Sequence, residues 1–186
     1  MSAQKIPTKI VIRPFRLDDL EAVMAIEPSA FGEHHWSRQS FVSELNKPEG
    51  VYFVACEGSH NKLIGYSGFW IIGDEGHITT LAVHPDYRGQ YVGERLLVNN
   101  ITEAKICGAN WLTLEVRASN EPAQNLYSKY GFKTVNIRPH YYQDNFEDAL
   151  ILWSENITTE GFDTLFKNRI AELKRKEEEF ADFSRS

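Results

Sequence analysis

Short apolar runs recur along the chain, each bounded by Gly, Pro, Asn or Asp, and this pattern predicts β-strands. The expected strands cover residues 10–12, 52–57, 63–72, 78–83, 111–116, 132–137 and 149–153. Short connections make the strands between 52 and 83 antiparallel, whereas a helical crossover makes the strand 111–116 parallel to 78–83. The expected fold class is α/β, with a single mixed, mostly antiparallel central sheet of about seven strands flanked by helices.

Helical spacing of apolar residues predicts the helices that flank this sheet. Their expected spans are 18–27, 37–48, 90–108 and 120–130. Ser37 and Asn120 are suited to cap the second and fourth helices, while Pro28 and Gly131 are expected to end the first and fourth. Residues 138–147 are expected to form a wide hairpin loop between the last two strands.

The C-terminal residues differ from the rest of the chain in composition. An amphipathic stripe is formed by Phe162, Leu165, Phe166, Ile170 and Leu173, and a charged run follows it. The pattern predicts an added helix, which either docks on the domain or joins two copies of the chain in a homodimer. The expected organisation is a flexible segment over 1–9, one domain over 10–155 and a helical extension over 156–186.

Composition limits the classes of partner. The chain has 186 residues, 42% of them hydrophobic and 12% aromatic, which suits a globular domain with an ample core. Its formal net charge of −6 argues against a basic surface for nucleic acid. No run is long enough to span a membrane, and residues 1–8 lack the apolar core of a signal peptide. We expect a cytoplasmic protein without bound metal, in which Cys56 and Cys107 are reduced, buried thiols.

Residues 78–97 are typical of a strand, a short loop and the start of a helix. The free N–H groups of a first helical turn and the helix dipole favour an anion at such a place, and Arg88 adds a positive charge. No Walker lysine follows Gly93, and Gly89 and Gly93 lack the spacing of a dinucleotide fingerprint. A phosphate-bearing ligand is therefore expected, the plainer alternative being a solvated turn with an incidental arginine.

Three further segments complete a family pattern. They are Leu114-Glu-Val-Arg-Ala-Ser-Asn120, then Ala123…Leu126-Tyr127 with Gly131-Phe132, and finally Tyr141-Tyr142…Glu147-Asp-Ala149. Together with the loop over 88–93, they resemble the bacterial ribosomal-protein-alanine N-acetyltransferases of the GNAT superfamily. The resemblance covers roughly residues 10–153 and is most specific over 81–153.

The resemblance implies a sheet that splays between the strands 78–83 and 111–116, with the pantetheine arm of acetyl-CoA in the gap. It implies acetyl-CoA as co-substrate, Glu115 as general base and Tyr127 as general acid. The cofactor contacts that it implies are Leu81, Ala82, Val83, Arg88, Gly89, Gln90, Tyr91, Val92, Gly93, Glu94 and Asn120.

These residue types also suit the chemistry of acetyl transfer to an amine. A protonated amine must give a proton to a carboxylate, a departing thiolate takes a proton from a weak acid, and a backbone N–H can stabilise an oxyanion. Plainer interpretations stay open for each residue. Glu115 could be a solvated carboxylate or one paired with Arg117, Tyr127 a core residue, and Asn120 only a helix cap.

Aromatic residues in two connecting segments supply candidate contacts to the acceptor. Tyr141 and Tyr142 are consecutive in the expected hairpin loop, and Phe31 and Trp36 lie between two helices. Loops often carry binding residues, so we interpret the four as walls of a groove for a peptide. For Phe31 and Trp36, a place in the core is an equally good interpretation.

Tyr91 departs from the family pattern, which usually has glycine at this place. Glycine is favoured either by a left-handed backbone or by the close approach of a ligand. Because a left-handed conformation is costly for tyrosine, we expect Tyr91 in the first helical turn, with its ring turned away from the pyrophosphate.

The expected function is acetyl-CoA-dependent Nα-acetylation of a protein N-terminus, such as that of a ribosomal protein, by direct transfer. Two alternatives remain open. One is acetylation of lysine side chains or small amines on the same fold, and the other is non-catalytic binding of acyl-CoA.

Overall fold

A computed structural model describes residues 9–32, 35–58 and 62–183 of the chain. Its strands are β1 (Ile10–Pro14), β2 (Gly50–Glu57), β3 (Lys62–Ile72), β4 (Glu75–Val83), β5 (Trp111–Arg117), β6 (Lys133–Tyr142) and β7 (Glu147–Trp153). They form a 7-stranded sheet in the order β1-β2-β3-β4-β5-β7-β6, with β4 and β5 parallel and the other neighbours antiparallel. The predicted mixed, mostly antiparallel sheet is confirmed.

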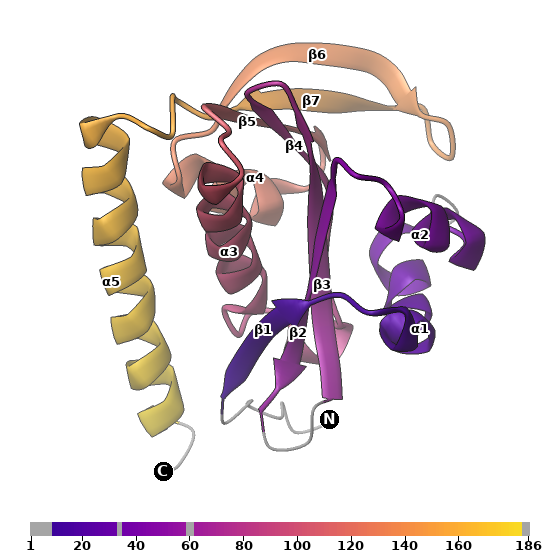
Figure 1. Ribbon diagram of the computed structural model, residues 1–186, viewed down its shortest axis with the longest axis horizontal. Helices are drawn as coiled ribbons and strands as arrows, with labels where there is room; N and C mark the ends of the chain where they lie inside the picture. Colours follow the sequence, from indigo (N-terminus) through magenta and orange to yellow (C-terminus); the bar gives the residue numbers. More distant parts are fainter. Residues whose placement is uncertain (1–8, 33–34, 59–61, 184–186) are drawn as a thin grey trace.

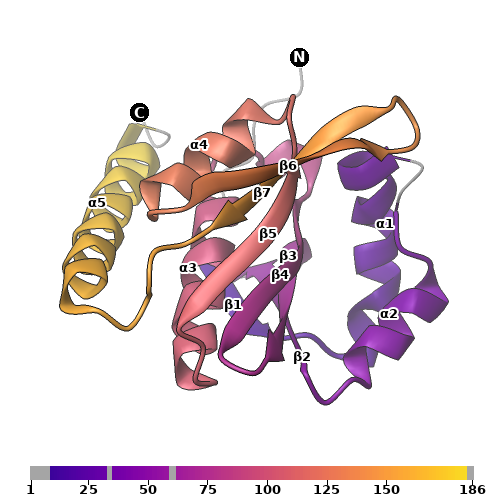
Figure 2. The same cartoon turned by 90° about the horizontal axis from the view of Figure 1, so that it is seen from above.

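The helices cover both faces of this sheet (Figures 1 and 2). They are α1 (Leu20–Phe31), α2 (Arg38–Leu45), α3 (Val92–Ile106), α4 (Glu121–Lys129) and α5 (Glu160–Phe183), and short 3-10 turns, η1 (Leu17–Asp19) and η3 (Pro85–Tyr87), precede α1 and α3. Helices α1 and α2 lie on one face, α3 and α4 on the other, and α5 lies outside α3 and α4. In the described residues, no helix is long and apolar enough to cross a membrane.

Helix α3 is held by the apolar face that its sequence predicts. Leu96, Leu97, Ile101 and Ala104 are fully buried in the core that α3 shares with the sheet. Glycine lets this helix approach β3 closely, because a Cβ on Gly65 would lie 3.2 Å from a Leu96 methyl carbon and 2.8 Å from a β4 carbonyl oxygen. The close approach fixes the start of α3 next to β4.

The parallel pair β4 and β5 is joined only at one end. Their register runs from Glu75↔Trp111 to His77↔Thr113, whereas β4 stays paired with β3 as far as Val83. Beyond His77 the two strands diverge, and the expected splay between 78–83 and 111–116 is confirmed. The other edge of β5 pairs with β7, from Thr113↔Trp153 to Arg117↔Ala149.

Two predicted boundaries were wrong. Pro28 does not end α1, which continues to Phe31 and ends at Gly32 with φ +59°. A proline disturbs the turn that precedes it, but the residues after it can still bond back, as the N–H of Gly32 does to the carbonyl oxygen of Pro28. Residues 138–147 are not a wide loop, because β6 runs on to Tyr142 through a bulge, with His140 at φ +54°. Single positive-φ positions of this kind are not visible in the hydrophobic pattern.

Two predictions about single residues were also wrong. Cys56 is buried as expected, but Cys107 is exposed, because it follows the last turn of α3 instead of facing the core. Tyr91 does not lie inside the first helical turn, since it is the residue before α3 and has a left-handed backbone with φ +62°. For a tyrosine this conformation costs roughly 1–2 kcal/mol.

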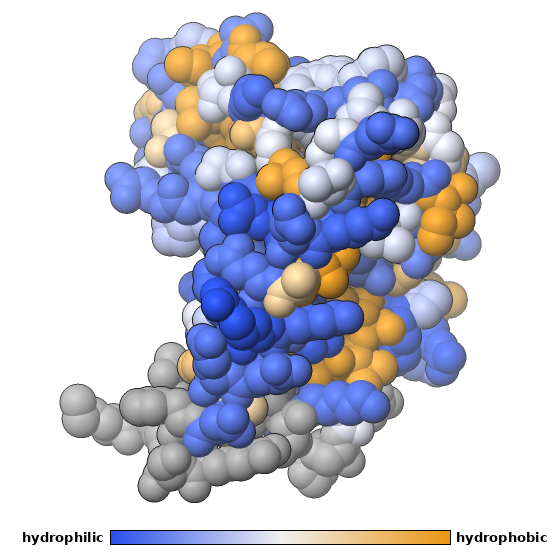
Figure 3. Space-filling model, turned by 90° about the vertical axis from the view of Figure 1, so that its left-hand side faces the viewer, coloured by the Kyte–Doolittle hydropathy of each residue, from blue (hydrophilic) through white to orange (hydrophobic). Residues whose placement is uncertain are grey.

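Helix α5 docks on the domain through its predicted stripe. Phe162, Phe166 and Leu173 are buried, and the ring of Phe166 packs against Tyr130 at the end of α4. Burying such a side chain is worth roughly 1.5–3 kcal/mol. The outer side of α5 is a hydrophilic ridge (Figure 3). The docking alternative is thus confirmed, while self-association through this helix stays a prediction.

Candidate active site

A continuous passage crosses the protein where β4 and β5 diverge. On one side lies an outer cleft of about 700 Å³, whose lining includes Phe31, Glu115 and Tyr142. On the other lies a loop cleft of about 550 Å³, bordered by residues 88–94 and by α4. A slot of about 160 Å³ connects them, because it shares Glu115 and Tyr142 with the first cleft and Leu81 and Asn120 with the second. Two ligands entering from opposite sides can therefore meet in the slot.

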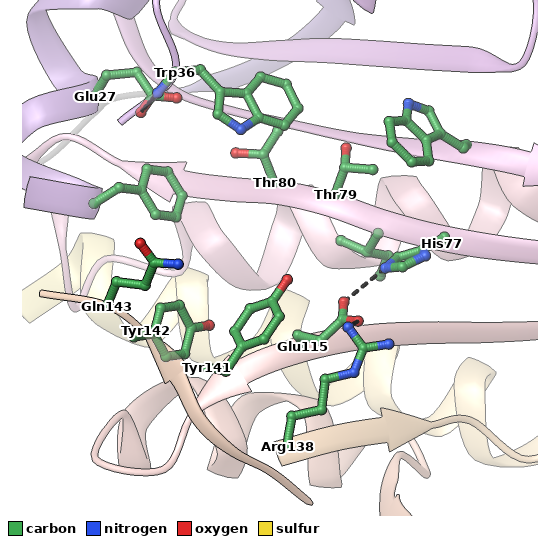
Figure 4. Close-up of a pocket in the computed structure, with 13 residues that line it drawn as sticks. Glu27, Trp36, His77, Thr79, Thr80, Glu115, Arg138, Tyr141, Tyr142 and Gln143 are labelled. Carbon is green, nitrogen blue, oxygen red and sulfur yellow. Dashed lines mark hydrogen bonds and ion pairs between the residues drawn. The ribbon is translucent and has the colours of Figure 1, made fainter. Parts of the chain in front are cut away.

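Aromatic side chains wall the outer cleft (Figure 4). Trp36 lies on one side, and Tyr141 and Tyr142 at the end of β6 lie opposite. Phe31, at the end of α1, also lines this cleft. Trp36 also packs on the core residue Phe41, with ring centroids 5.2 Å apart. Trp36 therefore both supports the core and lines the cleft.

Glu115 lies on β5 at the floor of this cleft, in contact with two basic side chains. Its Oε2 is 2.8 Å from Nε2 of His77, and its Oε1 is 3.2 Å from a guanidinium nitrogen of Arg138. The hydrogen bond from His77 lowers the pKa of Glu115 below its ordinary value, although partial burial acts in the opposite direction. A charged carboxylate only accepts hydrogen bonds, so Nε2 of His77 carries the proton of this bond.

The predicted alternative partner of Glu115 lies elsewhere. Arg117 makes ion pairs with Asp144 and Glu147, and its guanidinium lies 3.8 Å from the ring centroid of Tyr142. These contacts fix the turn between β6 and β7 and hold Tyr142 beside the slot. Arg117 thus shapes the cleft wall, and the partners of Glu115 are His77 and Arg138 instead.

The sequence analysis did not identify His77, Arg138 or Glu27, all of which line the outer cleft. His77 and Arg138 reach Glu115 only through strand register, which the sequence pattern did not supply. Glu27 is buried, and its Oε1 accepts a hydrogen bond of 2.6 Å from the hydroxyl of Tyr66. The sequence offered one sign of this role: Glu27 lies on the apolar side of its helix, and a carboxylate buried there requires a hydrogen-bond partner.

Tyr127 lies on α4, and its ring borders the slot. The ring packs against Phe132 with centroids 5.7 Å apart, so the core interpretation of this residue is correct for its ring. Burial raises the pKa of the hydroxyl, which keeps its proton through the neutral range. A phenol in this state can donate a hydrogen bond or a proton to a group in the slot.

The loop cleft presents an uncapped helix start. Tyr91, the residue before α3, gives no side-chain cap, so the N–H groups of Val92, Gly93 and Glu94 lack a side-chain acceptor from this position. All three residues line the cleft, as do Leu81, Ala82, Val83, Arg88, Gly89, Tyr91 and Asn120 among the predicted cofactor contacts. Such a helix start binds anions through its N–H groups and dipole.

Three of the predicted cofactor contacts in the loop have side chains that are hydrogen-bonded to other parts of the protein. Gln90 is buried and donates from Nε2 to the carbonyl oxygen of Asp86, so its side chain does not line the cleft. Arg88 donates to the carbonyl oxygen of Ser29 at 2.9 Å and ties the loop to α1. The Glu94 carboxylate bonds Lys129 and Tyr130 on α4, which leaves its backbone N–H at the cleft.

Asn120 is the helix cap that the sequence predicts. Its side-chain oxygen accepts a hydrogen bond of 3.2 Å from the N–H of Ala123, and the residue also lines the slot and the loop cleft. The two interpretations of this asparagine are compatible. No group of His, Cys, Asp and Glu side chains suited to a metal ion occurs in the part of the chain that the structure describes.

Comparison with known families defines the class of this protein. Residues 18–132 match the model of the acetyltransferase (GNAT) family. The chain therefore belongs to the GNAT family and is an N-acetyltransferase.

Individual relatives show which members of this family the chain resembles. The chain is 45% identical over 147 residues to the putative ribosomal protein bS18-alanine N-acetyltransferase of Bacillus subtilis, an alignment that covers 78% of this chain and 95% of that relative. It is 36% identical over 137 residues to the corresponding enzyme of Escherichia coli K12, covering 72% and 89% of the two chains. The crystal structure of the Escherichia coli ribosomal-protein-S18-alanine N-acetyltransferase superposes with a TM-score of 0.72 at 32% identity, covering 82% of this chain and 97% of that one.

The contact between His77 and Glu115 leads to a prediction about the charge of the site. His77→Leu removes the hydrogen bond that is the main cause lowering the pKa of Glu115, so this pKa should rise towards or above the ordinary value of a glutamate. Carbon-13 NMR titration of the glutamate carboxyl groups measures it directly. Arg138→Gln is the matched control and should give a smaller rise, because its guanidinium acts only through charge. An unchanged Glu115 titration in His77→Leu would contradict this account.

Proposed function

We propose that this protein transfers the acetyl group of acetyl-CoA to the α-amino group of a protein N-terminus of the ribosomal-protein-alanine type. The passage through the sheet carries the proposal, because it brings an aromatic acceptor cleft and an anion-binding loop cleft together at Glu115 and Tyr127. The ribosomal protein bS18-alanine N-acetyltransferases similar to this chain support the choice of acceptor.

The loop cleft fits acetyl-CoA. The uncapped N–H groups of Val92, Gly93 and Glu94 suit a pyrophosphate, and Arg88 adds positive charge at the same edge. Leu81 and Leu126 supply apolar surface along the way to the slot. When bound there, acetyl-CoA supplies the acetyl group as a thioester.

Glu115 takes the proton of the acceptor amine in this proposal, directly or through a water. Its lowered pKa makes it a weak base, so an acceptor that is already partly neutral suits it best. At pH 7.5 roughly a third of peptide α-amino groups are neutral, against about one in a thousand lysine side chains. The electrostatics of Glu115 thus favour an N-terminus over a lysine.

Two further groups act on the thioester in this proposal, one on the leaving thiolate and one on the carbonyl oxygen. The Tyr127 hydroxyl, kept protonated by burial, supplies the proton that the leaving thiolate requires. The edge of β4 beyond His77 has no β5 partner, which supports the assignment of a backbone N–H near Ala82 or Val83 to the oxyanion.

The acceptor is tested with two matched peptides. One begins with the N-terminal sequence of the host's own ribosomal protein bS18 and contains an internal lysine, and the other has the same sequence with a formylated N-terminus. With acetyl-CoA, we expect acetylation of the first peptide at its α-amino group and none of the second, as located by tandem mass spectrometry. Acetyl groups on lysine in both peptides would favour the lysine alternative, and cofactor binding without any transfer would favour the non-catalytic one.

Glu115→Gln keeps the size of the side chain and removes the base. We expect kcat/KM for the peptide to fall by on the order of 100-fold or more, in line with general-base contributions, with the Kd for acetyl-CoA within twofold of the wild type. Glu155→Gln, which removes an exposed carboxylate outside the clefts, is the control and should be fully active. Wild-type turnover in Glu115→Gln would exclude the assigned role.

Tyr127→Phe keeps the ring on Phe132 and removes only the hydroxyl. If the hydroxyl is the acid, kcat should fall by at least about tenfold while the melting temperature stays the same. If Tyr127 serves only as a core residue, both quantities should stay at their wild-type values. Steady-state kinetics and thermal melts on the same preparation distinguish the two results.

A further inference from the structure

Tyr91 holds a backbone conformation that tyrosine rarely adopts, at the point where the cofactor loop enters α3. Its φ is +62°, and its side chain is half-buried. A non-glycine residue keeps such a conformation only when its surroundings determine it. The neighbours of Tyr91 therefore bear on the geometry of the loop.

The ring of Tyr91 packs against α5. It meets the ring of Phe180 edge to face, with centroids 5.9 Å apart and planes at 88°. Edge-to-face aromatic pairs at this distance are stabilising beyond the area that they bury. This contact places the ring of Tyr91 against α5 at the edge of the loop cleft that the residue also lines.

A second contact ties the first turn of α3 to the same part of α5. Arg95, one turn after Tyr91, is bound by both carboxylate oxygens of Glu177, one of them at 2.6 Å from a terminal guanidinium nitrogen. Two parallel bonds of this kind fix orientation as well as distance. The Glu177 side chain is only 17% exposed, which limits screening of the pair by solvent.

A third contact joins α5 to the end of α4, which also borders the loop cleft. Arg169 donates a hydrogen bond of 3.1 Å to the carbonyl oxygen of Lys129, at the end of α4. Lys129 and Tyr91 both line the loop cleft. Helix α5 thus contacts residues at the start of α3 and at the end of α4, the two helices that border the cleft.

We infer that α5 positions the cofactor loop, and that Phe180 and Glu177 hold Tyr91 and the first turn of α3 in the conformation that binds the pyrophosphate of acetyl-CoA. This inference rests on the proposed cofactor site. Without these contacts Tyr91 can relax to a negative φ, which turns the N–H groups of residues 91–94 away from a common direction. A glycine at 91 would carry no such strain and would not depend on α5.

If α5 acts by holding the strained backbone of Tyr91, its effect should disappear when residue 91 is glycine. A double-mutant cycle in the full-length protein tests this. Phe180→Ala should raise the Kd and KM for acetyl-CoA at least fivefold, with kcat at saturation and the KM for the peptide within twofold of the wild type. In the Tyr91→Gly background, the same Phe180→Ala substitution should change the Kd less than twofold. Isothermal titration calorimetry gives the four Kd values.

Leu165→Ala is the matched control for loss of α5 packing, because Leu165 lies at the other end of this helix, near Gly131. It should lower the melting temperature without changing the Kd for acetyl-CoA. Amide hydrogen exchange of residues 91–95, measured without cofactor, should become faster in Phe180→Ala than in Leu165→Ala. This second readout tests the support of the loop independently of catalysis.

Each outcome bears on a different statement. An equal rise of the Kd in both backgrounds, or no rise in either, would overturn the role of α5 while leaving the proposed function intact. Failure of the wild-type protein to bind acetyl-CoA would overturn both. Transfer to the peptide with an unchanged Kd in Phe180→Ala would overturn only the inference about α5.

Discussion

The divergence of β4 from β5 beyond His77 and Thr113 is the constraint on which the rest of the structure depends. Backbone N–H and C=O groups inside a protein need hydrogen-bond partners, so a strand edge without its neighbour must face water or a ligand. The passage through the sheet lies along this edge and joins the two clefts. If the ladder continued to Val83, the slot that joins the two clefts beside Glu115 would be closed.

Electrostatics at the floor of the outer cleft follow from the same divergence. Where the strands are still paired, His77 on β4 is close enough to bond Glu115 on β5, and Arg138 approaches from β6. The carboxylate is therefore held charged and fixed in direction at the point where the gap opens. Preorganised charge of this kind suits a reaction in which a proton must leave an amine before the new bond forms.

The other side of the passage depends on a strained residue and an added helix. A loop that binds phosphate through backbone N–H groups requires those groups to point in one direction. Glycine reaches such conformations without strain, whereas Tyr91 reaches its own beside Phe180 and next to an ion pair between Arg95 and Glu177. A change in sequence at one position of the loop is thus accompanied by contacts from a distant part of the chain.

The sequence by itself determined the element types, the parallel crossover, the caps Ser37 and Asn120, and the docking stripe of α5, because periodicity and capping are local properties. Its motifs also indicated the family, Glu115, Tyr127 and the loop over 88–93. Only the tertiary structure decided what surrounds these residues. The pairing of Glu115 with His77 and Arg138 depends on strand register, and the ring of Tyr91, whose φ is positive, packs on a helix from a distant segment. Contacts of this kind leave no periodic trace along the chain, since they arise only when separate elements come together.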